Sequence, residues 1–111
     1  MKKRINSQEK GKRGEREWAE YLREHGYPEA RRGRQFRGSP DSPDVVCGIP
    51  DTHAEVKRTE TLSIYAAMFQ AEYDCGDDMP YVAHRRNGKE WLVILRADDF
   101  IRVMEKAQFP F

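Results

Sequence analysis

The sequence predicts one α/β domain in which a small mixed β-sheet is flanked by helices, in the order α-β-β-β-α-β-β-α. Three observations predict this class: apolar residues at helical spacing in two segments, short alternating or apolar runs, and an Asn-Gly turn in the second half. The 111 residues suffice for one compact domain, 1–111, with residues 1–6 expected as a basic tail. With 38% hydrophobic and 35% charged residues, the core must be thin, which favours a homodimer.

The first half begins with a predicted helix over residues 7–25. Trp18, Tyr21 and Leu22 recur at helical spacing, and Gly26 ends the helix. Residues 30–36 are rich in arginine and fit either an edge strand or a loop. Two prolines within residues 39–43 predict a turn, because each proline fixes φ and disfavours a helix.

Two strands are expected next, over residues 44–47 and 53–58. The first is a short apolar run that Gly48 ends, and residues 49–52 form the turn between them. The second alternates, with Ala54 and Val56 on one side and Glu55 and Lys57 on the other. The two strands are therefore predicted to form a hairpin.

The second half predicts a helix, two strands and a last helix. The helix covers residues 62–73 and carries one face formed by Leu62, Tyr65, Ala66, Phe69 and Tyr73. Residues 81–84 form a strand, and the Asn87-Gly88 turn leads into a second. Residues 91–95 are almost continuously apolar and predict a central strand. Asp98 or Asp99 is expected to cap a helix that runs through Lys106.

The charges are unevenly distributed along the chain. Residues 1–38 hold 12 Lys and Arg against 6 acids, whereas residues 39–111 hold 8 against 13. This segregation fits a polyanionic partner, although a solvated charge-rich surface would look the same. No apolar stretch is long enough to span a bilayer, and no secretory signal is present, so we expect a cytoplasmic protein with reduced cysteines. The histidines and the two cysteines lack zinc spacing.

The chemistry is expected where Asp44, Glu55 and Lys57 meet. Residues two apart in a strand share a face, so Glu55 and Lys57 point together, and Asp44 on the partner strand can face them. Clustered carboxylates repel one another unless a cation neutralises them. Mg²⁺ prefers such oxygen ligands, and Mn²⁺ is expected to substitute for it. The carbonyl of Val56 is a further candidate ligand, and Glu15 on the first helix would hold a metal-bound water or a second metal.

Each of these residues has a less specific interpretation. Glu15 competes with a solvated helix residue and with Glu17, and Asp44 competes with Asp41, which also follows Ser-Pro. Asp44 is the better candidate because it leads directly into the apolar strand. Glu-x-Lys alone would fit an exposed edge strand with an ion pair. The order helix acid, Pro-Asp, Glu-x-Lys and a following helix is more specific than any part of it.

The residues Pro43-Asp44 and Glu55-Val56-Lys57 resemble the signature of the PD-(D/E)xK nuclease superfamily. The opening segment, residues 10–17, resembles the start of archaeal-type Holliday junction resolvases, and residues 84–91 resemble small resolvase-like nucleases of phages. The resemblance implies a restriction-endonuclease-like fold and a Mg²⁺-dependent dimer that nicks paired strands of four-way DNA junctions. It implies catalytic roles for Glu15, Asp44, Glu55 and Lys57, and a supporting role for Gln70 on the following helix.

Basic residues near the N-terminus are candidates for DNA binding. Arginine can grip phosphates bidentately, and phosphate contacts position a protein without reading sequence. The candidates are Lys10, Lys12, Arg13, Arg16, Arg31, Arg32, Arg34 and Arg37. Two other functions compete with a junction resolvase: a phage nuclease that acts on flaps, nicks or linear duplex, and a DNA-binding module with a vestigial site.

Overall fold

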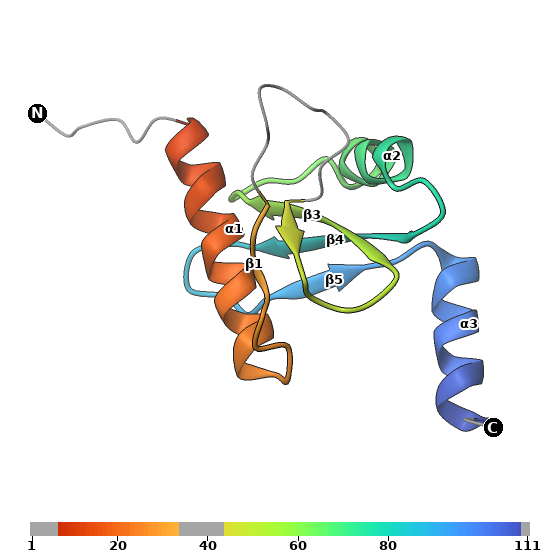
Figure 1. Ribbon diagram of the computed structural model, residues 1–111. Helices are drawn as coiled ribbons and strands as arrows, with labels where there is room; N and C mark the ends of the chain where they lie inside the picture. The colour runs from red at the N-terminus through yellow and green to blue at the C-terminus, as the bar shows by residue number, and fades with distance from the viewer. Residues whose placement is uncertain (1–6, 34–43, 110–111) are drawn as a thin grey trace, which may run out of the picture.

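The computed structural model describes residues 7–33 and 44–109 (Figure 1). The elements are α1 (Ser7–Glu24), β1 (Arg31–Arg32), β2 (Val45–Val46), β3 (Thr52–Arg58), α2 (Ile64–Asp74), β4 (Met79–Arg85), β5 (Leu92–Ile94) and α3 (Ala97–Gln108). Their order is the predicted one, and the arginine-rich segment does contain a strand. The expected N-terminal tail, the proline turn, Asp41, Arg34 and Arg37 lie outside the described residues.

The strands form two small sheets. In the larger sheet, β4 lies between β3 and β5, with β3 parallel and β5 antiparallel to it. Because parallel neighbours need a crossover, α2 connects β3 to β4, whereas the Asn-Gly turn connects β4 to β5. The smaller sheet pairs β1 with β2, so the expected hairpin of β2 with β3 is replaced by a looser contact. That contact includes a hydrogen bond from Asp44 N to the carbonyl of Ala54, 3.0 Å long.

The expectation that residues 91–95 form a central strand is wrong. β5 has three residues and lies at the edge of its sheet, with the Leu92 side chain 62% exposed. The central strand is β4, in which Val82 and Ala83 are fully buried. An apolar run predicts that a strand will be covered, but it does not identify the surface that covers it. In this sheet the central position is taken by β4, which the β3–α2–β4 crossover places beside β3.

The two faces of the larger sheet are covered by different helices, as Figure 1 shows. α1 places Trp18 and Leu22 against a core that includes Val56 and Tyr81. Trp18 Nε1 donates a hydrogen bond to the Tyr81 hydroxyl at 2.9 Å, which satisfies a buried polar pair. α2 packs through Ala67, Met68 and Ala71 onto Val82 on the other face.

The aromatic face expected on α2 does exist, but it points away from the sheet. Tyr65 is 91% exposed, and Phe69 and Tyr73 are also exposed. The small side chains of Ala67 and Ala71 form the packed face instead, because they let the helix approach the sheet closely. Aromatic residues at helical spacing therefore marked a surface rather than the core.

The expected aspartate cap of the last helix is also wrong. Arg96 occupies the N-cap position without a side-chain capping bond. Asp99 lies in the first turn, only 2% exposed, and accepts hydrogen bonds from Arg96 Nε at 2.7 Å and from Arg102. These two guanidiniums hold the pKa of Asp99 below its usual value, the hydrogen bond from Arg96 being the largest cause. Within the described part of the chain, α3 makes few contacts with the other elements, and much of its apolar face is exposed.

Both cysteines are free thiols, as expected. In the ranges 7–33 and 44–109, none of the helices has the length and hydropathy that a bilayer crossing needs.

Candidate active site

Glu55 and Lys57 lie on the same face of β3, as the strand alternation predicts. Lys57 Nζ is 3.4 Å from Glu55 Oε1 and donates a hydrogen bond to Gln70 Oε1 of α2 at 3.2 Å. Glu55 is only 5% exposed, whereas Lys57 is half-buried. The structure thus brings the two motif residues and Gln70 together.

Asp44 is fixed against the edge of β3 by two hydrogen bonds. Its Oδ2 accepts the backbone N–H of Val56 at 2.7 Å, and its own N–H donates to Ala54. Their partners on β3, Ala54 and Val56, are the residues directly before and after Glu55. In an extended strand the N–H and C=O of one residue point to the same edge, so the Val56 carbonyl also faces the Asp44 side.

The pKa of the Asp44 carboxyl is raised from 3.8 to about 7. Desolvation by burial is the largest cause of this shift, and the negative charge of Glu55 is the second. The Val56 N–H and the Lys57 ammonium act in the opposite direction without cancelling it. Burial is also the largest cause of a raised pKa at Glu55, where Lys57 again opposes the shift. A half-buried and a buried carboxylate, both with raised pKa values, form a site in which a cation would be stabilised.

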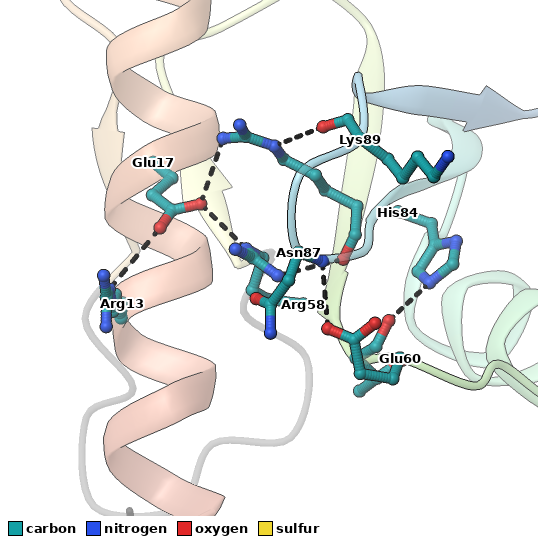
Figure 2. A network of polar contacts seen from close by, with 9 residues as sticks. Arg13, Glu17, Arg58, Glu60, His84, Asn87 and Lys89 are labelled. Atoms are coloured by element: carbon teal, nitrogen blue, oxygen red, sulfur yellow. Dashed lines mark hydrogen bonds and ion pairs between the residues drawn. The ribbon is translucent and has the colours of Figure 1, made fainter.

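Of the two candidate acids on α1, Glu15 is the one whose charge acts on this pair. The negative charge of Glu15 contributes to the raised pKa of both Asp44 and Glu55. Its carboxylate also forms an ion pair with Arg32 of β1. Residues two apart on a helix point about 200° apart, and Glu17 accordingly contacts a separate group of arginines (Figure 2). Of the two rival helix acids, Glu15 is therefore the one beside the motif.

The side chains present fit a hard divalent cation with a small number of protein ligands. Among the described residues, no group of three or more His, Cys, Asp or Glu side chains could by itself enclose a metal ion. Mg²⁺ is usually held by one or two carboxylates together with waters and substrate phosphate. Asp44 and Glu55, with the Val56 carbonyl, supply such an oxygen set.

The basic candidates within the described residues lie on two elements. Lys10, Lys12, Arg13 and Arg16 are on α1, and Arg31 and Arg32 are on β1. Arg32 forms an ion pair with Glu15, which joins β1 to the acidic site. Two further arginines, Arg58 and Arg85, contact Glu17 and are not among the basic candidates that the sequence predicts. Arg58 directly follows the motif lysine, but its pairing with Arg85 depends on the β3–β4 register, which the sequence does not give.

Comparison with known families agrees with this geometry. The family model of the archaeal Holliday junction resolvases (Hjc) matches residues 6–109.

The chain belongs to this family. It is therefore a member of the PD-(D/E)xK nuclease superfamily, and its mixed sheet flanked by helices is consistent with the restriction-endonuclease-like fold. The match runs through the second half as well as the motif half. Searches among curated proteins and among solved structures gave no significant match.

Proposed function

We propose that this resolvase family member is a Mg²⁺-dependent endonuclease that hydrolyses backbone phosphodiesters at four-way DNA junctions. The observation that carries the proposal is the pair of poorly solvated carboxylates, half-buried Asp44 and buried Glu55, beside the Lys57 ammonium. Asp44, Glu55 and the Val56 carbonyl would hold the metal, and Glu15 would hold a metal-bound water or a second ion. Mn²⁺ is expected to replace Mg²⁺.

Bound Mg²⁺ would lower the pKa of a coordinated water and stabilise charge on the phosphate. The chain's own residues then orient the reaction. The ion pair with Glu55 and the hydrogen bond to Gln70 hold Lys57 Nζ at the site, where its charge can stabilise the phosphate and help to position the attacking water. Gln70 acts through Lys57, and the Val56 N–H fixes the Asp44 carboxylate. Arg32 anchors Glu15 from β1.

We further propose that the protein acts on DNA as a homodimer in the cytoplasm. Two active sites related by a two-fold axis suit two symmetric strands of a junction. The support for a dimer is apolar surface that the described chain leaves uncovered, on β5 and on the apolar face of α3. α3 is the better candidate for the interface, because it is amphipathic and contacts its own chain little.

Two alternatives keep parts of this proposal. A nuclease acting on flaps, nicks or linear duplex would share the chemistry, and a DNA-binding module would share only the basic surface. The raised pKa values of Asp44 and Glu55 argue against the module, because two poorly solvated and poorly neutralised acids destabilise a fold that makes no use of them.

A cleavage assay on a labelled four-way junction tests the proposal. Wild type is incubated with Mg²⁺ or with EDTA, beside a linear duplex of the same sequence. We expect paired nicks in the junction only with Mg²⁺, and a loss of cleavage with retained binding in the Asp44→Asn variant. Equal cutting of junction and duplex would support the broader nuclease, and absence of cutting with any divalent metal would support the binding module.

A further inference from the structure

Glu17 gathers three arginine side chains on the side of α1 that faces away from Glu15. Its carboxylate lies 3.0 Å from Arg58 Nε, 3.5 Å from Arg13 Nε and 3.6 Å from Arg85 Nη1 (Figure 2). One carboxylate balances one guanidinium, so this group keeps an excess of positive charge. The three arginines come from α1, β3 and β4, which are far apart in the sequence.

The fold brings these arginines together in two ways. The parallel register pairs Arg58 with Arg85, so both side chains extend from the same end of the sheet. Gly14 lets α1 approach that end, because a Cβ at this position would lie 2.5 Å from Arg58 Cβ. The Arg58 side chain is consequently only 12% exposed while it carries a full charge.

A pocket opens beside this group. Lys10, Arg13, Arg58 and Asn87 line a volume of about 180 Å³. Asn87 belongs to the turn between β4 and β5, and its backbone N–H donates to Glu60 Oε1 at 2.9 Å, which fixes the turn. Because a water in the liquid occupies about 30 Å³, the pocket has room for a tetrahedral anion. Its lining residues supply three cations, one amide and no carboxylate.

We propose that this pocket binds one internal, non-scissile phosphodiester of the DNA strand. The inference rests on the proposed function, which makes DNA the substrate. Arg58 follows Lys57 directly, so the pocket begins where the strand that carries the acidic site ends. The guanidinium groups and the side-chain amide can donate hydrogen bonds to phosphate oxygens. A phosphate contact adds affinity without selecting a base. Glu17 is a positioning residue that holds the Arg13 and Arg58 side chains at the pocket.

Junction binding without metal tests the pocket separately from cleavage. Dissociation constants are measured in EDTA at several salt concentrations for wild type, Lys10→Gln and Arg13→Gln. Each variant should bind roughly fivefold more weakly, and the slope of log affinity against log salt should fall by about 1. Arg13→Lys keeps the charge and should restore the slope. Lys106→Gln on α3 loses the same charge outside the pocket and should leave the slope unchanged.

Neutral methylphosphonates placed at single positions of the junction locate the phosphate. At one internal position the substitution should weaken wild-type binding but should add nothing to Arg13→Gln, because the contact is already lost. If the Arg13→Gln effect is additive at every position, or depends only on a 5′-terminal phosphate, the internal phosphodiester assignment is wrong.

The two proposals fail in different ways. A chain that cuts junctions while Lys10→Gln and Arg13→Gln behave like Lys106→Gln would refute the pocket alone. A chain that never cuts DNA but shows the pocket-dependent salt slope would refute the enzyme and keep the pocket.

Discussion

Replacing Asp44 with Asn should stabilise the metal-free protein while it removes Mg²⁺-dependent cleavage. Asp44 is half-buried, and desolvation together with the charge of Glu55 raises its pKa from 3.8 to about 7. An asparagine of similar shape carries no charge, and its side-chain oxygen can still accept the Val56 N–H. The substitution therefore removes the electrostatic cost and keeps the hydrogen bond.

The size of the effect follows from the pKa difference. Between 3.8 and 7 the folded chain binds more protons at Asp44 than the unfolded chain does, so the free energy of unfolding falls as pH rises through this window. At pH 8, where the folded carboxyl is ionised, the shift costs at most about 4 kcal/mol of stability. At pH 5, where folding must protonate the carboxyl, it costs about 2 kcal/mol, at 1.36 kcal/mol per pKa unit. The variant should therefore gain most over wild type at alkaline pH.

Urea unfolding of both proteins at pH 5 and pH 8, with EDTA or Mg²⁺, measures this difference. Mg²⁺ at pH 8 should stabilise wild type and leave Asp44→Asn unchanged, because ligand binding to the native state raises its stability. Wild-type cleavage with Mg²⁺ should rise through about pH 7, since the metal must displace the Asp44 proton. A variant that is less stable than wild type at both pH values, or equally stabilised by Mg²⁺, would refute this reasoning.

Three further changes have defined outcomes. Gln70→Ala removes the hydrogen bond that orients Lys57, so single-turnover cleavage should slow about tenfold at unchanged junction affinity; an unaltered rate would exclude a positioning role. Tyr81→Phe leaves the buried Trp18 N–H without its acceptor and should lower the free energy of unfolding by about 1–3 kcal/mol in a urea titration; equal stability would contradict the core assignment. Met104→Glu charges the apolar face of α3 and should convert a dimer to a monomer in light scattering, whereas a persistent dimer would move the interface elsewhere.

The sequence alone predicted the order of elements and the residues of the candidate site. The reason is that helical and strand periods are local properties, and that Pro-Asp with Glu-x-Lys has few other uses in this context. Glu55 and Lys57 share a face because residues two apart in a strand must do so. The family match over residues 6–109 confirms the resemblance on which the functional reading was based.

The tertiary structure decided what depends on which surfaces meet. Periodicity identifies a helix face or an apolar run but not the surface that packs against it. For this reason the sequence wrongly predicts a central strand at β5 and does not identify the packed face of α2. The sequence favours Glu15 over Glu17 only by resemblance, and the physical difference between the two acids depends on how α1 packs against β3. The pairing of Arg58 with Arg85 needed the parallel register, because contacts between distant segments are fixed by packing of the whole domain and not by local sequence.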